Sequence, residues 1–259
     1  MEINNIYHGD CRKILSKEIK HNSIQTVFAD PPYNLSGNNL KWEGNKTGGD
    51  WYMINEDWDK MGDSDYRLFT YEWIEKINAV LKNNGSIFIS CTYHNIGEII
   101  LTLKKLDFKI NNIITWYKTN AMPNMTKRTF THACEYIIWA VKGKNWIFNY
   151  EKMKTINPKK TKQGKPKQMR DMWEMPLCQG KERIKGEDGR AAHPTQKPEE
   201  LLKRVILASS NKGDIVLDPF FGTGTTGYIA DKYNRKWIGI EIEKEYIKIA
   251  KERIYHKGE

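Results

Sequence analysis

Two apolar runs lie far apart in this chain, and each leads into an aspartate followed by a proline. The first run, residues 24–29, ends at Asp30, and the second, residues 215–217, ends at Asp218. Both runs are typical of buried strands, and segments of helical periodicity lie between them, as a mostly parallel α/β sheet requires. Ligands of open α/β sheets bind at the carboxyl ends of the strands. We therefore expect the two Asp-Pro turns to share one edge of a single sheet and to form one site.

The first turn continues as Asp30, Pro31, Pro32 and Tyr33. Each proline fixes φ near about −65° and donates no N–H, so the carbonyl groups of the turn are free to accept hydrogen bonds from a ligand. Asp30 adds a carboxylate acceptor and Tyr33 adds a flat aromatic face. Together these groups suit the exocyclic amino group of a stacked base. Taken alone, the four residues are equally well explained as an ordinary turn that ends a strand.

The second turn is rich in glycine and threonine between Asp218 and Thr226. Glycine lets the backbone approach a ligand closely and adopt positive φ, and the helix that follows presents N–H groups that bind an anion. The next strand, residues 236–240, leads into Glu241, where an acid commonly binds ribose hydroxyls. The spacing is not that of the G-x-G-x-x-G fingerprint, so NAD is not the expected ligand.

Two shorter segments are consistent with the same site. Residues 193–198, His-Pro-Thr-Gln-Lys-Pro, precede a helix expected at 199–207, and Pro198 also suits the first turn of that helix. Asp10 follows a short apolar segment near the N-terminus and is equally suited to cap a helix over 12–15. A plain helix start therefore remains an alternative interpretation for both segments.

Together these motifs resemble those of the amino-group DNA methyltransferases, which use S-adenosylmethionine. The acidic first residue of the tetrad resembles the adenine-N6 branch. The order of the motifs, with the cofactor turn last, resembles the β group of that family from about residue 3 to the C-terminus. Residues 112–120, 130–136 and 193–198 are similar to the DpnA-type second methylase of restriction systems that recognise GATC. The resemblance implies a Rossmann-like α/β methyltransferase fold with permuted motif order.

The resemblance also implies roles for individual residues. Asp30 and the Pro31 carbonyl accept hydrogen bonds from the adenine amino group, and Tyr33 stacks on the base; with Pro32 these are the expected catalytic residues. The expected S-adenosylmethionine-binding residues are Asp10, Thr195, Lys197, Asp218, Phe220, Gly222, Thr223, Gly224, Thr225 and Glu241. Neither a covalent intermediate nor a catalytic cysteine is needed. The target base must be flipped out or single-stranded to reach the site.

Two other functions stay open on the residues alone. Cytosine-N4 methyltransferases share the scaffold, although their tetrad more often begins with serine than with an acid such as Asp30. A DNA-binding relative that has lost catalysis would keep the fold, but the intact tetrad and glycine turn argue against it. The methylated base, or its absence, separates the three functions.

The composition agrees with an enzyme that handles nucleic acid. A chain of 259 residues suffices for a single catalytic domain, 1–259, and its net charge of +10 favours a polyanionic partner. We expect a loop beside the catalytic turn at about 36–63 and a target-recognition insertion at about 143–192. Within the insertion, basic residues suited to DNA phosphates are Lys159, Lys160, Lys162, Lys165, Lys167 and Arg170. A solvated basic loop without a partner would have the same composition.

The cysteine pattern favours a reducing compartment. Its four cysteines are scattered without metal-ligand spacing, and no apolar stretch is long enough to span a membrane. We therefore expect a cytoplasmic enzyme with no metal site. A cognate restriction endonuclease, a second methylase and a homodimer are partners that the resemblance suggests and the residues leave open.

Periodicity predicts the regular elements. Expected helices are 66–81, 96–106, 201–209 and 244–254; expected strands are 24–29, 86–90, 110–117, 136–141, 215–217 and 237–240. The strands at 110–117 and 136–141 are expected to pair antiparallel at the edge of the sheet, and residues 83–85 are expected to end the helix at 66–81. Residues 143–193 show no clear pattern.

Overall fold

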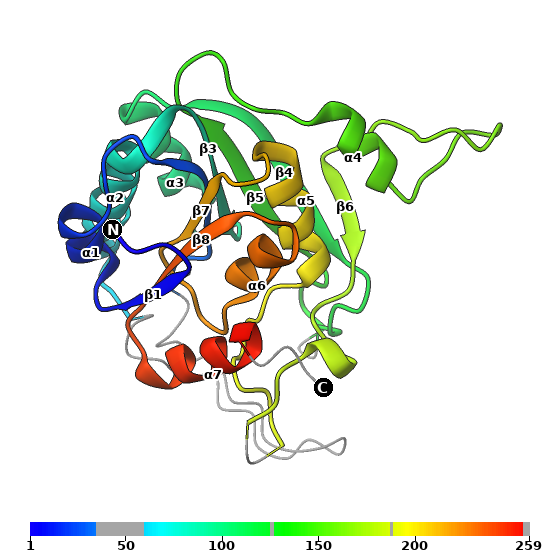
Figure 1. The fold of residues 1–259 in the computed structure, drawn as a ribbon. Coiled ribbons are helices and arrows are strands. Elements are labelled where there is room, and N and C mark those ends of the chain that lie inside the picture. Colours follow the sequence, from blue (N-terminus) through cyan, green and yellow to red (C-terminus); the bar gives the residue numbers. More distant parts are fainter. Residues whose placement is uncertain (35–59, 125–126, 187–188, 256–259) are drawn as a thin grey trace.

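The computed structural model describes residues 1–34, 60–124, 127–186 and 189–255, and all of its named strands join one sheet (Figure 1). The strands are β1 Asn5–His8, β2 Ile24–Ala29, β3 Leu81–Cys91, β4 Lys109–Lys118, β5 Cys134–Val141, β6 Met172–Met175, β7 Ile215–Asp218 and β8 Lys236–Glu241. The α-helices are α1 Cys11–Lys17, α2 Asp63–Val80, α3 Ile96–Lys105, α4 Tyr150–Ile156, α5 Glu199–Ser209, α6 Thr225–Lys232 and α7 Lys244–Tyr255, with a short 3₁₀ helix at Gly180–Glu182.

The strand order is β1-β8-β7-β2-β3-β5-β4-β6. Among these strands β5 alone runs against the others, pairing antiparallel with both β3 and β4. β2 and β7 are parallel neighbours, with Thr26 opposite Val216. Their carboxyl ends therefore meet at the same edge, which confirms that the turns at Asp30 and Asp218 lie side by side.

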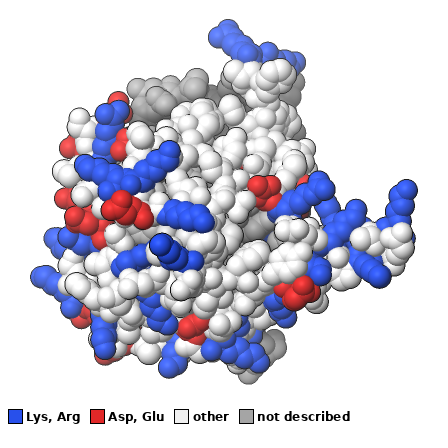
Figure 2. Space-filling model, turned by 90° about the horizontal axis from the view of Figure 1, so that it is seen from above, with Lys and Arg blue, Asp and Glu red and all other residues white. Residues whose placement is uncertain are grey.

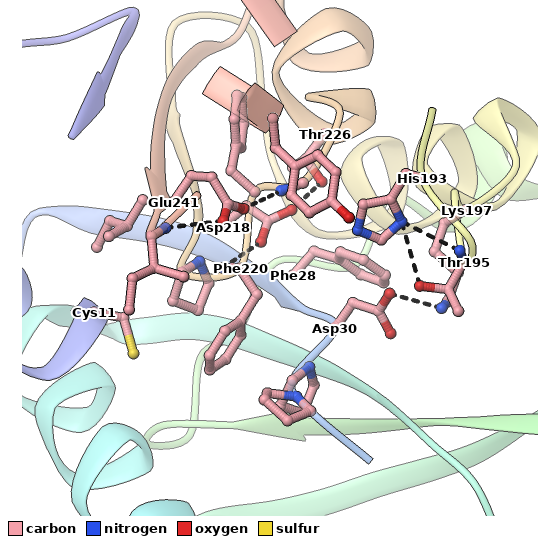
Figure 3. A pocket seen from close by; sticks show the side chains of 18 of the residues that line it. Cys11, Phe28, Asp30, His193, Thr195, Lys197, Asp218, Phe220, Thr226 and Glu241 are labelled. Atoms are coloured by element: carbon pink, nitrogen blue, oxygen red, sulfur yellow. Dashed lines mark hydrogen bonds and ion pairs between the residues drawn. The ribbon is translucent and has the colours of Figure 1, made fainter. Parts of the chain in front are cut away.

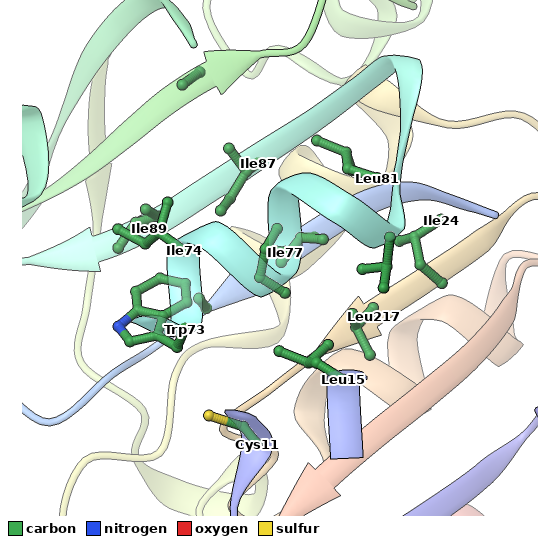
Figure 4. Packing of buried hydrophobic residues seen from close by; sticks show 14 of the residues in the cluster. Cys11, Leu15, Ile24, Trp73, Ile74, Ile77, Leu81, Ile87, Ile89 and Leu217 are labelled. Atoms are coloured by element: carbon green, nitrogen blue, oxygen red, sulfur yellow. The ribbon is translucent and has the colours of Figure 1, made fainter. Parts of the chain in front are cut away.

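Helices cover both faces of the sheet. All six residues of β2 are buried, as expected for a strand that is covered on both faces. On one face Val27 belongs to a hydrophobic cluster that includes buried residues of α1, α2 and α3. Figure 4 shows Leu15 of α1 and Ile77 of α2 in this cluster. On the other face Phe28 packs with α5, α6 and α7. Trp116 and Trp139 are buried, so their expected place in the core is confirmed.

Two expectations were wrong, and one region without a clear pattern contains regular elements. Residues 83–85 do not separate α2 from the next strand, because α2 ends at Val80 and β3 begins at Leu81 and includes them. The β4–β5 pair is not at the edge, because β6 pairs with the outer side of β4. Residues 143–193 contain α4 and β6, which are too short to show a period but bury Met153, Trp173 and Met175. Such short elements are stabilised mainly by tertiary packing.

The expected loop at 36–63, with its three tryptophans, lies almost entirely outside the described residues. Within the described part of the chain, no helix has the length and apolar character needed to cross a membrane.

Candidate active site

A cavity of about 460 Å³ opens at the carboxyl edge of the sheet, between the turns that follow β2 and β7 (Figure 3). Its walls come from both turns, the starts of α1 and α2, the end of β8 and the segment before α5. Most of the predicted catalytic and cofactor residues line it: Asp10, Asp30, Pro31, Pro32, Tyr33, Thr195, Lys197, Asp218, Phe220, Gly222, Thr223, Thr225 and Glu241. Gly224 is the one member of these two sets that is not among the lining residues. The fold thus brings motifs from both ends of the chain into one site.

The expected catalytic tetrad, residues 30–33, contains a carboxylate that is already hydrogen-bonded. The Tyr33 hydroxyl donates to Asp30 Oδ1 at 2.8 Å and lies 2.7 Å from the Ser90 hydroxyl. Burial, together with the charge of Asp30, raises the pKa of Tyr33 well above its usual value, so the phenol keeps its proton. The Tyr66 hydroxyl donates to the Pro32 carbonyl at 3.1 Å and fixes the turn from α2.

Lys197, expected to contact the cofactor, is paired with the carboxylate of Asp30. Its Nζ lies 2.7 Å from Asp30 Oδ2, and its side chain is only 7% exposed. Glu135 Oε2 is a second carboxylate near the same nitrogen, at 3.7 Å. Burial disfavours the charge, yet Asp30 and Glu135 together hold the pKa of Lys197 above its usual value. The segment before α5 is therefore joined directly to the turn that follows β2.

The glycine-rich turn is held by Asp218, whose side chain is buried. Asp218 Oδ1 accepts from the Phe220 amide at 2.9 Å, and Oδ2 accepts from the Thr226 hydroxyl at 2.5 Å. Burial raises the pKa of Asp218 well above its usual range. The carboxyl group thus shapes the turn itself, which is a structural role beside the expected cofactor contact.

Glycine is required at two positions of this turn. Gly222 and Gly224 have φ of +49° and +76°, which other residues rarely adopt. Gly224 also packs against Ala250 of α7, where a Cβ would be 2.9 Å from the alanine side chain. Gly224 precedes α6 without a side-chain cap, so the first N–H groups of that helix are available for a ligand.

Glu241 closes the turn from the end of β8. Its Oε2 accepts from the Gly222 amide at 2.7 Å, and its Oε1 accepts from the amides of Ile242 and Glu243. Burial raises its pKa. Because a carboxylate can accept about four hydrogen bonds, the side chain retains capacity for a hydroxyl group.

Asp10 is a helix cap, as the alternative interpretation expected, and it also lines the cavity. Its Oδ1 accepts from the Arg12 amide at 2.8 Å at the start of α1. The Arg12 guanidinium forms further hydrogen bonds that lower the pKa of Asp10, and it also contacts Glu72 at 2.7 Å.

Two lining residues, His193 and Cys11, were not among the predicted catalytic or cofactor residues. His193 lies beside the cavity, and its Nδ1 accepts from the Thr195 amide at 3.2 Å. Burial, Lys197 and Arg183 lower the pKa of His193 to about 4, which keeps the ring neutral. Burial also raises the pKa of Cys11 to about 12, so its thiol is not a nucleophile. In the described ranges no cluster of residues is suited to a metal ion.

The expected DNA-binding lysines lie away from this cavity. Residues 158–167 form a projecting hairpin, bridged between Lys160 and Pro166, that leads into the amino-terminal end of β6. Since β6 runs parallel to β2, the hairpin leaves the sheet at the edge opposite Asp30. Figure 2 shows its basic side chains on the projection at the right. Lys159 pairs with Glu174 at 2.6 Å.

Comparison with known proteins identifies the family. A family model described as DNA methylase, N6_N4_Mtase, matches residues 24–252. This chain belongs to the DNA methylase family. The match includes both turns of the cavity, so the family predicted from the motifs is confirmed.

Two relatives match this DNA methylase over nearly its whole length. Type II methyltransferase M.HinfI of Haemophilus influenzae is 43% identical, over 97% of this chain and 68% of that protein. Type II methyltransferase M2.DpnII of Streptococcus pneumoniae is 42% identical, over 98% of this chain and 90% of that protein.

Solved structures confirm the fold of this methylase. The crystal structure of the M1.HpyAVI–SAM complex has a TM-score of 0.68 and 31% identity, covering 96% of this chain and 98% of that one. The cytosine-N4-specific PvuII DNA methyltransferase has a TM-score of 0.72 at 20% identity, and the match covers 96% of this chain and 85% of that one. At this identity the similarity concerns the fold alone. The expected Rossmann-like methyltransferase architecture is therefore correct, with β6 added outside the antiparallel pair.

Proposed function

We propose that this protein transfers a methyl group from S-adenosylmethionine to N6 of adenine in DNA, within GATC, as part of a restriction-modification system. The observation that carries the proposal is the carboxylate of Asp30, aligned beside the glycine-rich turn in one cavity. Similarity to two Type II methyltransferases and to a solved SAM complex supports it. Residues 1–259 would act as one catalytic domain, since the named strands share one sheet.

The cavity fits S-adenosylmethionine in size and chemistry. Its volume of about 460 Å³ is in the usual range for small-molecule sites. The uncapped N-terminus of α6 and the close approach at Gly222 suit the carboxylate end of the ligand, and Glu241 suits the ribose hydroxyls. Asp10 lines the cavity beside Glu241, because β1 pairs with β8 and the Gly9 amide donates to the Glu241 carbonyl, so it suits the adenosine end of the ligand. When bound, S-adenosylmethionine supplies an electrophilic methyl group on its sulfonium.

The catalytic turn would activate the target nitrogen. The N6 lone pair of adenine is delocalised into the ring, so the nitrogen is a weak nucleophile until it becomes more tetrahedral. Hydrogen bonds from the amino group to Asp30 and to the Pro31 carbonyl favour that change, and Tyr33 offers a face for the ring. Proximity and prealigned acceptors carry most of the rate enhancement.

DNA would approach from the carboxyl edge of the sheet, where the cavity lies. The β4–β5 connection is at this edge, because β5 begins there, and it carries the exposed basic residues Lys127 and Arg128. Phe130 beside them is 97% exposed. It lies five residues before Glu135, hence within about 18 Å of that site residue along the chain. An exposed aromatic ring beside two cations suits stacking on a base and contact with phosphates.

The test is methyl transfer from labelled S-adenosylmethionine to unmethylated DNA, with the modified nucleoside identified by mass spectrometry. We expect N6-methyladenine in GATC-containing DNA and none in GATC-free DNA. Asp30→Ala should reduce kcat by about 100-fold or more. Asp171→Ala is the matched control, because Asp171 is exposed at the amino-terminal end of β6. N4-methylcytosine would reassign the target base, and bound cofactor without any methylated base would indicate a silent DNA-binding relative.

A further inference from the structure

Four charged side chains form a continuous chain that ends at the catalytic carboxylate. Lys118 Nζ of β4 lies 3.4 Å from Glu135 Oε1 of β5, and Glu135 Oε2 lies 3.7 Å from Lys197 Nζ. Lys197 Nζ in turn lies 2.7 Å from Asp30 Oδ2. The four side chains are between 7% and 16% exposed. Two cations alternate with two anions, which is the arrangement a poorly solvated site requires.

This chain of charges exists because of the reversed strand. β5 is antiparallel to β3, so its amino-terminal start lies at the carboxyl edge, with Tyr136 opposite Cys91. Glu135 therefore enters the site from a strand start, whereas Asp30 enters from a strand end. Glu135 Oε2 also lies 3.5 Å from the Tyr33 hydroxyl. Glu135 thus contacts both Lys197 and Tyr33, the two side chains that bind Asp30.

We infer that Glu135 is a positioning residue for methyl transfer, which acts on Asp30 through Lys197; the inference rests on the proposed function. Lys197 binds one oxygen of Asp30 and leaves the other to the target amine once Tyr33 withdraws. Without the Glu135 carboxylate, Lys197 has Asp30 as its remaining close anion, so the ammonium shifts toward it. A displaced carboxylate no longer meets the amino hydrogens at the angle that the transition state requires.

Glu135→Gln tests this role, since the amide keeps the shape and removes the charge. We expect kcat to fall by about 100-fold, the loss typical of a misplaced catalytic group. The KM for S-adenosylmethionine should stay within about twofold, because Glu135 is not a lining residue of the cavity. Glu98→Gln is the matched control: Glu98 lies on α3 and pairs with the exposed Arg67 at 3.4 Å. A kcat close to wild type in Glu135→Gln would overturn the inference.

A double-mutant cycle separates positioning from a merely structural effect. If Glu135 acts through Lys197, adding Glu135→Gln to Lys197→Met should lower kcat little beyond Lys197→Met alone. Multiplied losses would contradict the inference, because they would mean that Glu135 acts independently. Should Glu135→Gln not fold, Glu135→Asp retains the charge but withdraws it by one methylene. A reduced kcat with unchanged KM for S-adenosylmethionine then supports the role, and an unchanged kcat opposes it.

The wild-type reaction distinguishes failure of this inference from failure of the proposed function. If wild type yields no N6-methyladenine, the proposed function is wrong. If wild type yields it while Glu135→Gln is fully active, the function stands and the positioning role is wrong.

Discussion

The Tyr33 hydroxyl donates a hydrogen bond to Asp30 Oδ1 at 2.8 Å, the oxygen left after Lys197 has bound the other at 2.7 Å. Both carboxylate oxygens are thus engaged before any substrate arrives. On the proposed function, a target amine would take the place of the Tyr33 hydroxyl, and the Tyr33 ring would turn to stack on the base. The Ser90 hydroxyl, 2.7 Å from the Tyr33 oxygen, is a partner for the displaced group.

The hydroxyl and the aromatic face of Tyr33 can be tested separately. Tyr33→Phe removes the competing hydroxyl and keeps the stacking face, so kcat/KM for DNA should stay within a few fold of wild type. Tyr33→Ala removes the face as well and should lower kcat/KM by about 10- to 100-fold, the value of one stacked base. Steady-state methylation of a GATC duplex measures both. Equal losses in the two variants would contradict a stacking role.

The packing of Phe221 under β8 predicts a large effect of a small substitution. A Cβ added at Gly239 would overlap with the Phe221 ring, which stacks on Trp237 at a centroid distance of 5.4 Å. Gly239→Ala should therefore lower the free energy of unfolding by about 1–3 kcal/mol. Gly97→Ala is the control, because the described residues leave open space beside Gly97 in α3. It should be neutral or stabilising. Urea denaturation measures both, and a neutral Gly239→Ala would contradict this packing.

His193 predicts how stability depends on pH. Burial, Lys197 and Arg183 lower its pKa from 6.5 to about 4, so the unfolded chain binds a proton more readily between these values. Stability should fall as pH decreases from about 6.5 toward 4, by on the order of 3 kcal/mol from this residue. His193→Gln should flatten this part of the curve, whereas His21→Gln, at an exposed histidine, should not. Urea titrations across this range test the prediction, and identical curves for wild type and His193→Gln would refute it.

The position of the cavity predicts which basic residues matter for DNA. Charge removal at Lys127 and Arg128, on the β4–β5 connection, should weaken DNA binding more than the same change at Lys162 and Lys165 on the projecting hairpin. Removal of a cation that binds a phosphate reduces the slope of log affinity against log salt by about one. Fluorescence anisotropy at several salt concentrations compares the two double variants. A larger effect at Lys162 and Lys165 would favour the hairpin.

Phe130 offers an independent probe of the same edge. Phe130→Ala should lower kcat/KM for duplex DNA by up to about 10- to 100-fold if the ring stacks on a base. Leu101→Ala is the control, since Leu101 is 65% exposed on α3 and lies outside the proposed DNA surface. Steady-state methylation of duplex DNA measures kcat/KM for both variants. An unchanged kcat/KM in Phe130→Ala would show that Phe130 is not part of the DNA surface.

The sequence alone determined the two Asp-Pro turns and the sheet that aligns them. Residues 24–29 and 215–217 are continuous apolar runs, which is the local pattern of strands buried on both faces. The glycines of the second turn are equally local, because their positive φ is a property of each residue. Motif order then indicated the family without any knowledge of contacts.

Only the tertiary structure decided which side chains these residues contact. Lys197 was expected at the cofactor and lies on Asp30, and Glu135 joined the site because β5 runs against its neighbours. The basic hairpin lies at the edge of the sheet opposite Asp30, because four residues of β6 pair parallel with β4. Strand direction and ion pairing link segments that are distant along the chain, and they follow from packing of the whole sheet. Local periodicity reports which face of an element is buried, but not what lies against its ends.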